Sequence, residues 1–244
     1  MRLTENVYLV GSGHFGLSQD FDSSVYVVNC NGSLVMIDTG AGCNIDIILK
    51  NIRKDGLNPE NISNVLLTHY HADHAGGAKK LKDLIGCKVY ISAIEADVLK
   101  NGDEKGLKLD IAKRSGLYSP DYVFSNCEAS VELRNNDLIS CNDFVFKALN
   151  IPGHSEGSIC YFIDLPEGKA LFSGDVVFAE GVIGLLNCDG SNLSDYRNYM
   201  NRLSNLNVDM LFPGHFVFVL SKGQKHIDKA IASLSLLGLP KNFI

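Results

Sequence analysis

Residues 68–77, with the sequence THYHADHAGG, constrain this chain more than any other stretch. The apolar run 65–67 before them predicts a short buried strand, and we expect a helix over 75–85 after them. The stretch would therefore lie on a turn at the carboxyl end of a strand, where open α/β proteins place their ligand sites. Imidazole and carboxylate groups suit zinc, iron or manganese, and no cysteine is present to choose among these metals. The metal-ligating residue types in the stretch are His69, His71, Asp73 and His74.

Three later segments each place one more ligand-type residue after a glycine at the end of an apolar strand. A glycine at that position lets the backbone approach closely while the next side chain points into a cleft. Each segment alone is typical of an ordinary turn. Because hydrolytic metal sites need three or four protein groups per metal, the segments and the motif together predict one metal site. The three residues are His154, Asp175 and His215.

The length and charge of the chain favour one globular domain that acts on a small molecule. We expect residues 1–244 to form a single domain, because 45% of them are hydrophobic and no repeat or Pro/Gly/Ser-rich linker divides them. The formal net charge of −6 argues against a nucleic-acid binder, whose phosphate contacts need clustered Lys and Arg. The cluster Lys79, Lys80 and Lys82 is typical of the solvated face of a helix. The oligomeric state is left open.

Cysteine usage and hydropathy predict a cytoplasmic protein. Residues 1–6 begin no long apolar run, and no stretch approaches the ~18 consecutive apolar residues that a membrane helix needs. The seven cysteines are odd in number and show no CxxC spacing. Cys30, Cys87, Cys141 and Cys160 lie in apolar, strand-like segments, which suits reduced thiols packed as small hydrophobic groups. A reducing cytoplasm is the compartment we expect.

The order of the expected elements is strands, helices, strands and helices, which predicts two sheets packed face to face with helices outside. Asn31-Gly32 is a type I′ hairpin signal. Residues 93–122 combine helical patterning with glycine breaks, and we expect a helical insertion, or lid, on the active-site side. Strands are expected at 7–10, 24–30, 33–37, 65–68, 88–92, 130–133, 143–149, 158–163, 170–172 and 210–212. Helices are expected from 45–50 onward and at 75–85, 193–206 and 224–237.

The signature THxHxDH at 68–74, followed in order by His, Asp and His, resembles the metallo-β-lactamase superfamily. The resemblance covers nearly the whole chain, from the Asp38-Thr39-Gly40 turn to His215. It implies an α/β protein with a four-layer αβ/βα sandwich, in which two mixed β-sheets lie face to face with helices outside. It also implies two divalent metal ions at the edge of the sheets, zinc in the first place, with iron or manganese as alternatives.

Carried over residue by residue, the resemblance implies a role for each candidate. His69, His71 and His154 are expected to bind the first metal, and Asp73, His74 and His215 the second. Asp175 is expected to bridge the two. Asp38 resembles the family's carboxylate that orients ligands without binding metal. Asp73 is also the candidate catalytic residue, because it would touch both a metal and the proton of the hydroxide nucleophile.

The expected reaction is hydrolysis, in which a metal-activated hydroxide attacks a thioester or activated ester of a small molecule. The segment 174–181 has the pattern GDxxFxxG and is similar to glyoxalase II, the hydroxyacylglutathione hydrolases. Acyl-homoserine lactonases instead carry Tyr at the position of Phe178, and that hydroxyl helps an alkoxide to leave. A thiolate leaves without such help, so Phe178 favours thioesters.

Two departures from glyoxalase II qualify this resemblance. Residues 216–244 are too few for its carboxy-terminal helical domain, and Gly184-Leu185-Leu186 stands where that family has an Arg. The chain therefore resembles a glyoxalase II-like member without that domain. Three alternatives stay open: a lactonase of the acyl-homoserine-lactone type, a phosphodiesterase or endoribonuclease, and a mononuclear-iron persulfide dioxygenase. His14 and His226 match no ligand position.

Overall fold

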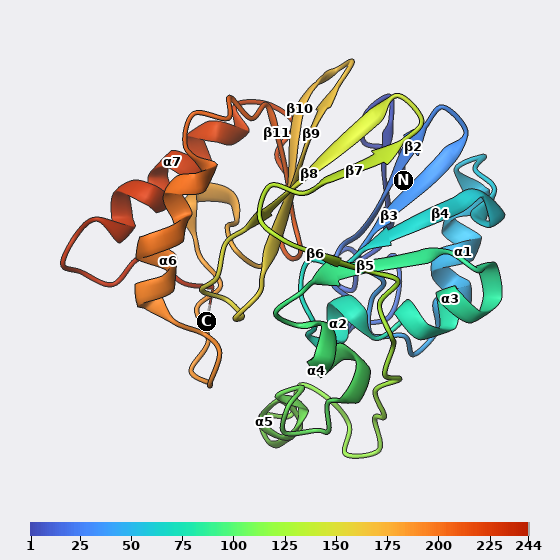
Figure 1. Cartoon of the computed structure of the whole chain (residues 1–244), viewed down its shortest axis with the longest axis horizontal. Helices are drawn as coiled ribbons and strands as arrows, with labels where there is room; N and C mark the ends of the chain where they lie inside the picture. The colour runs from blue at the N-terminus through green and yellow to red at the C-terminus, as the bar shows by residue number, and fades with distance from the viewer. Residues whose placement is uncertain (244) are drawn as a thin grey trace. The chain divides into compact units, whose positions relative to one another are not determined.

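A computed structural model describes residues 1–243 as two mixed β-sheets with helices around them (Figure 1). The first sheet has the strand order β1-β2-β3-β4-β5-β6, and the second has the order β11-β10-β9-β8-β7. By its internal contacts the chain divides into two compact units. The first unit contains residues 1–132 and 141–143, and the second contains residues 133–140 and the chain from 144 onward.

The first sheet is antiparallel at one edge and parallel in its middle, since β1-β2-β3 pair antiparallel and β3-β4-β5 pair parallel. Its strands are β1 (Val7–Gly11), β2 (Val25–Cys30), β3 (Ser33–Ile37), β4 (Ile62–Leu66), β5 (Lys88–Ser92) and β6 (Val131–Leu133). The helices of this unit are α1 (Ile45–Lys54), the 3₁₀ turn η1 (Pro59–Asn61), α2 (Ala72–Ala75), α3 (Ala78–Ile85), α4 (Ala96–Asn101) and α5 (Leu109–Arg114).

The second sheet pairs β8-β9-β10 antiparallel and β10-β11 parallel. Its strands are β7 (Leu138–Cys141), β8 (Phe144–Asn150), β9 (Ile159–Leu165), β10 (Gly168–Gly174) and β11 (Met210–Pro213). The helical elements of the second unit are η2 (Ala179–Gly181), α6 (Leu193–Tyr199), η3 (Met200–Leu203) and α7 (Gly223–Leu234).

Each unit has its own hydrophobic core. In the first, α1 buries Ile48 and Ile52 at helical spacing in a cluster that also contains Val27 and Met36 of the sheet. In the second, Ile227 of α7 is buried in a cluster with Leu171 of β10. Parallel pairing then brings strand ends together: β3 and β4 end at one edge of the first sheet, and β10 and β11 end at one edge of the second.

Several sequence expectations are confirmed. Residues Asn31 and Gly32 have φ values of 53° and 95°, as a type I′ turn requires. β3 and β5 have the expected bounds. Most other expected elements differ in extent; for example, β4 ends at Leu66, the helix expected at 193–206 is α6 followed by η3, and α7 ends at Leu234. The strand β7 was not expected.

The expected single helix over 75–85 is wrong, because the structure has α2 and α3 on either side of Gly76 and Gly77. The N–H and hydroxyl of Thr39 both donate to the carbonyl of His74, at 2.7 and 2.8 Å, so that carbonyl is not available to a continuing helix. The two glycines are required by close packing. A Cβ on Gly76 would lie 2.4 Å from the carbonyl oxygen of Ala41.

The helical character expected for 93–122 is confirmed by α4 and α5, with Gly102 capping the end of α4. Figure 1 shows both helices on the side of the first unit that carries α2. Leu99, Leu109 and Tyr118 from this segment are buried in the core of the first unit. The segment therefore has a packed inner side, and its action as a lid stays a prediction.

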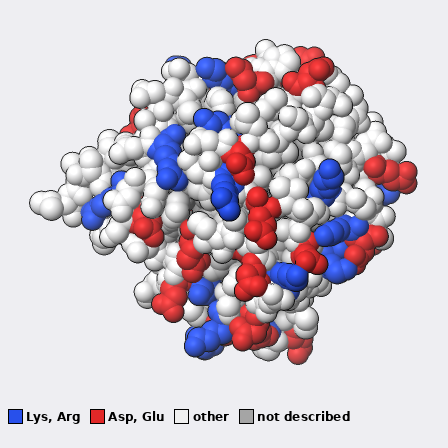
Figure 2. Space-filling view, in the orientation of Figure 1, with Lys and Arg blue, Asp and Glu red and all other residues white. Residues whose placement is uncertain are grey.

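The surface and the cysteines give two further observations. On the face seen in Figure 2, basic and acidic side chains are intermixed. None of the helices in residues 1–243 has the length and apolar composition needed to cross a membrane. All seven cysteines are free thiols, and Cys30, Cys87, Cys127, Cys141 and Cys160 are buried.

Candidate metal centre

The first unit gathers the four ligand candidates of the motif at the carboxyl end of β4 and in α2. His69 follows the strand, His71 caps the start of α2, and Asp73 and His74 lie inside that one-turn helix. His69 and His74 are fully buried, whereas His71 and Asp73 are partly exposed. The structure thus places two ligand candidates in the interior and two at the surface beside them.

These four side chains point their ligand atoms toward one another. Nε2 of His69 lies 3.0 Å from Nδ1 of His71, and Nε2 of His74 lies 3.4 Å from Oδ2 of Asp73. The rings of His69 and His74 have centroids 4.1 Å apart. Two nitrogen ligands at ~2.1 Å from one tetrahedral cation are about 3.4 Å apart, so the first pair fits a shared metal.

Asp38 determines which ring nitrogen carries the proton in the buried His69 and His74. It follows β3, and its Oδ2 accepts from Nδ1–H of His74 at 2.8 Å and from the hydroxyl of Thr68 at 2.8 Å. Because a carboxylate can only accept, Nδ1 of His74 carries the proton and Nε2 keeps the lone pair that a metal needs. The hydroxyl proton of Thr68 goes to Asp38, so its oxygen accepts from Nδ1–H of His69 at 3.0 Å.

Glu95 supports the backbone between two of the ligands. Its carboxylate, which is 1% exposed, accepts a hydrogen bond of 3.0 Å from the N–H of Tyr70. Tyr70 lies between His69 and His71 in the chain, so this contact fixes the turn that aims both rings. Glu95 itself is the residue before α4, which links the 93–122 segment to the motif.

The second unit gathers the other three candidates at the carboxyl ends of β10 and β11 and on the loop after β8. Oδ2 of Asp175 lies 3.6 Å from Nε2 of His154 and 3.4 Å from Nε2 of His215. Asp175 and His154 are buried, and the His215 side chain is 26% exposed. A carboxylate between two imidazoles has the donor set of a metal-bridging group.

Gly184 sets the protonation of His154. Its carbonyl accepts from Nδ1–H of His154 at 2.5 Å, so Nε2, which faces Asp175, keeps its lone pair. The fully buried Tyr196 connects the backbone of Asp175 to that of Gly184. Its hydroxyl donates to the carbonyl of Asp175 at 3.2 Å and accepts from the N–H of Gly184 at 3.3 Å.

Both ligand sets therefore fit divalent metal ions. They offer neutral imidazole nitrogens and carboxylate oxygens, and three of the five imidazoles, those of His69, His74 and His154, have Nδ1 engaged by an oxygen acceptor. This is the arrangement that orients a metal-binding histidine. The donor chemistry suits zinc, iron and manganese alike.

Other charged and aromatic groups of the first unit lie near Asp73. Burial raises the pKa of Asp22, whose carboxylate accepts from the N–H of Ala41 at 2.7 Å. Burial and the charge of Asp73 raise the pKa of Tyr118 far above its usual range, so this phenol stays protonated. Tyr118 stacks on Tyr122, whose hydroxyl donates to the carbonyl of Ala41.

The two histidines that are not ligand candidates have different surroundings. His14 is exposed on its loop, against the ring of Phe15. Nδ1 of His226 accepts a hydrogen bond of 2.8 Å from the N–H of Glu180, which gives this histidine a structural role.

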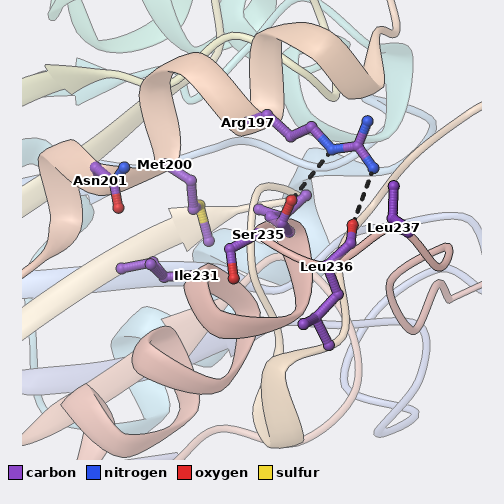
Figure 3. A pocket seen from close by; sticks show the side chains of 8 residues that line it. Arg197, Met200, Asn201, Ile231, Ser235, Leu236 and Leu237 are labelled. Atoms are coloured by element: carbon purple, nitrogen blue, oxygen red, sulfur yellow. Dashed lines mark hydrogen bonds between the residues drawn. The ribbon is translucent and has the colours of Figure 1, made fainter.

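A pocket of about 420 Å³ lies elsewhere in the second unit, between α6 and the end of α7 (Figure 3). The Arg197 guanidinium beside it donates to the carbonyls of Leu234 at 3.1 Å and Leu236 at 3.3 Å, and so caps α7. The remaining lining residues are Met200, Asn201, Ile231, Ser235 and Leu237. No ligand candidate lines this pocket, and its chemistry is that of packing.

Sequence reasoning found the ligand candidates and Asp38 but missed their supports. Thr68, Glu95 and Gly184 orient ligands through single hydrogen bonds. The only sequence signal was the Thr that opens the motif. Glu95 and Gly184 act across 25 and 30 residues, a separation that no local pattern reports.

The chain is similar to several known proteins. A family model described as the metallo-beta-lactamase superfamily matches residues 19–215. The chain is 30% identical over 230 residues to a protein of Gallus gallus named acyl-coenzyme A thioesterase MBLAC2, covering 85% of this chain and 79% of that protein. It is 27% identical over 215 residues to lactamase-like protein aptB of Emericella nidulans. That match covers 87% of this chain but only 57% of the fungal protein.

Solved structures confirm the expected fold. The metallo-beta-lactamase GOB-18 from Elizabethkingia meningoseptica superposes with a TM-score of 0.74 at 20% identity, covering 96% of this chain and 88% of the other. Two mixed sheets with helices around them match the α/β sandwich of that fold. At this identity the likeness concerns the fold alone.

Proposed function

Because this chain belongs to the metallo-β-lactamase superfamily, we propose that it is a metal-dependent hydrolase that uses two divalent ions to cleave thioesters or other activated esters of small molecules. The observation that carries the proposal is the presence, in each unit, of a His/Asp set with oriented imidazoles.

The ligand assignment follows the family pattern. Under this proposal, His69, His71 and His154 would hold one metal, Asp73, His74 and His215 would hold the other, and Asp175 would serve both. Support comes from within each unit. Nε2 of His69 lies 3.0 Å from Nδ1 of His71, and Oδ2 of Asp175 lies 3.6 Å from Nε2 of His154 and 3.4 Å from Nε2 of His215. We propose zinc in the first place, with iron or manganese as alternatives, because imidazoles and carboxylates suit all three metals.

When bound, such a pair of cations supplies a hydroxide nucleophile near neutral pH and polarises the carbonyl oxygen of the substrate. Asp73 would accept the proton of the water molecule that becomes the hydroxide and would orient that hydroxide, since its side chain is 19% exposed and can reach solvent while contacting His74. The buried Asp38 keeps His74 from taking that proton at Nδ1, because that nitrogen is already protonated toward the carboxylate.

The thioester preference rests on the chemistry of the leaving group. Phe178, three residues after Asp175, is 1% exposed and packs against Phe243 and Phe216. No hydroxyl at that position can protonate an alkoxide, whereas a thiolate leaves without a proton. The relative from Gallus gallus carries the name of an acyl-coenzyme A thioesterase, which agrees with this class of substrate. A glyoxalase II-like reaction belongs to the same class.

We also propose a cytoplasmic location, on the grounds of the free thiols.

The test begins with the metal content of protein purified without added metal, followed by turnover of thioester, lactone and phosphodiester substrates. We expect two metal equivalents per chain, loss of activity on chelation and the highest kcat/KM on a thioester. Asp175→Ala should remove at least one metal. One iron per chain together with oxygen consumption would instead mean a persulfide dioxygenase, and a phosphodiester or lactone as the best substrate would replace the thioester.

A further inference from the structure

An aromatic cluster lies beside two ligand candidates of the second unit. The rings of Phe178 and Phe243 stack with centroids 5.4 Å apart, and Phe216 contacts Phe178 at 5.5 Å and Phe243 at 6.3 Å. The cluster reaches the ligands directly. Phe243 lies 6.4 Å from the ring of His154, and Phe216 lies 6.4 Å from that of His215.

The position of Phe216 is imposed by a closed loop. The N–H and carbonyl groups of Leu211 and Val219 pair at 2.8 Å in both directions, and the N–H of Gly214 donates to the carbonyl of Gly174. The loop between them carries His215 and then Phe216. Phe216 has a φ of 61°, in the left-handed region that disfavours a bulky side chain. Strain of this kind is found where a side chain must be presented for function.

A second backbone contact brings Phe243 to the cluster. The N–H of Ile183 donates to the carbonyl of Lys241 at 3.0 Å, and the N–H of Phe243 donates to the carbonyl of Ile183 at 3.1 Å. The chain thus uses two separate segments to place rings beside His154 and His215.

The loop that carries Phe216 also exposes other apolar side chains to solvent. Phe216 is 38% exposed, Val217 51% and Leu220 47%, and all three follow the ligand candidate His215 in one loop. Exposed leucines also occur at 236, 237 and 239, but those residues follow α7 and have no ligand candidate among their neighbours in sequence. Apolar surface beside reactive groups is the usual composition of a substrate site.

Building on the proposed function, we propose that Phe216, Val217 and Leu220, backed by Phe178 and Phe243, bind an unbranched apolar acyl chain of the thioester substrate. The three side chains proposed to form this surface are all apolar, so a medium-length alkyl chain is preferred over a short hydroxyacyl group. Phe216 is the residue that determines this specificity.

The test uses the metal-loaded protein and thioesters of N-acetylcysteamine with acetyl, lactoyl, butanoyl, hexanoyl and octanoyl groups. Each buried methylene contributes up to about a fourfold gain, so we expect kcat/KM to rise at least about tenfold from acetyl to octanoyl. Octanoyl should also exceed lactoyl.

The informative variant is Phe216→Gly, because it removes the whole side chain and glycine suits the left-handed backbone. The ratio of octanoyl to acetyl kcat/KM should fall by about fivefold or more. The matched control is Leu138→Ser, which removes an exposed apolar side chain from β7. An unchanged ratio in Phe216→Gly, or an equal change in the control, would overturn the inference.

A binding measurement separates this inference from the proposed reaction. S-octyl and S-ethyl thioethers of N-acetylcysteamine cannot be hydrolysed, and calorimetry gives their affinities for wild type and Phe216→Gly. A protein that hydrolyses none of the thioesters but binds the octyl compound more tightly, and loses that difference in the variant, supports the acyl site and refutes the thioesterase function. Equal affinity for both thioethers refutes the acyl site.

Discussion

Nδ1 of His74 lies 2.8 Å from Oδ2 of Asp38, and both side chains are buried. The same carboxylate accepts from the N–H and the hydroxyl of Thr68, each at 2.8 Å. One residue at the end of β3 therefore serves three donors at the end of β4 and in α2. Since Asp38 has a φ of 59°, it is also held in a left-handed conformation that Asp and Asn tolerate better than other side chains.

Replacement of Asp38 should separate stability from metal binding. Asp38→Ala leaves three buried donors without their acceptor, at about 1–3 kcal/mol each, which is comparable with the whole stability of a typical domain. We expect this variant to fold poorly. Asp38→Asn keeps the shape and one acceptor oxygen, so it should fold. Its metal affinity should fall about 10–100-fold, because His74 loses the carboxylate that orients it.

Denaturation curves and zinc titration of the two variants check this prediction. Asp121→Asn, the same substitution at an exposed position of the same unit, is the control for both readouts. Wild-type metal affinity in a folded Asp38→Asn protein would contradict the orienting role.

Gly184 should tolerate no side chain. A Cβ there would lie 2.2 Å from the carbonyl oxygen of Asp175 and 3.0 Å from Nδ1 of His154, so Gly184→Ala must displace both ligand candidates. We expect loss of at least one metal equivalent and a drop in activity of about 100-fold or more. Gly238→Ala is the matched control, because a Cβ at that position meets nothing within 4 Å. Elemental analysis showing wild-type metal in Gly184→Ala would refute the expectation.

The sequence predicts the parts of this site that depend on residue type and local spacing. His69 and His71 could be identified because they alternate at a strand end, and Asp175 because a glycine precedes it at the end of β10. The break between α2 and α3 could not, since it depends on Thr39 and Ala41, more than thirty residues earlier. Helical periodicity continues through Gly76 and Gly77 without any sign of that contact.

The same reasoning explains the errors in the second sheet. β7 has four residues with two of them buried, Ile139 and Cys141, and so short an alternation resembles a loop. The placement of Phe243 beside His154 depends on pairing with Ile183, sixty residues away in the chain. Contacts of this range leave no local pattern in the sequence.

The thiols should divide into two classes. Cys43 is exposed and Cys188 partly exposed, whereas the other five are buried. Burial raises the pKa of Cys87 to about 11, so only about one thousandth of it is thiolate at pH 8. A thiol reagent at pH 8 should therefore modify about two cysteines quickly and all seven after unfolding without reductant. Fewer than seven in the unfolded protein would reveal a disulfide and argue against a reducing compartment.

The last prediction concerns the pH dependence of stability through His226. Burial lowers the pKa of this histidine, with smaller effects from Lys229 and Lys225 in the same direction, and Glu180 acts in the opposite one. The structural cause is visible in the hydrogen bonding. Nδ1 accepts from the N–H of Glu180 at 2.8 Å, and a proton on Nδ1 would remove that acceptor.

The sign follows from proton linkage. Below the ordinary histidine pKa near 6.5, the unfolded chain binds a proton at His226 that the folded protein resists. Unfolding therefore takes up protons, and the free energy of unfolding decreases as the pH decreases. The contribution of His226 is therefore fully present above about pH 6.5 and is lost as the pH falls through the lower pKa of the folded protein. His226→Asn supplies an acceptor that does not titrate.

Urea unfolding of wild type and His226→Asn between pH 5 and 8 isolates this effect, because all other titrating groups are common to both proteins. We expect the difference in free energy of unfolding between wild type and variant to shift in favour of the variant as the pH falls. A difference that stays constant would mean that folding does not change the pKa of His226. A difference that shifts toward wild type at low pH would mean that the charge of Glu180 outweighs burial and that His226 is protonated more readily in the folded protein.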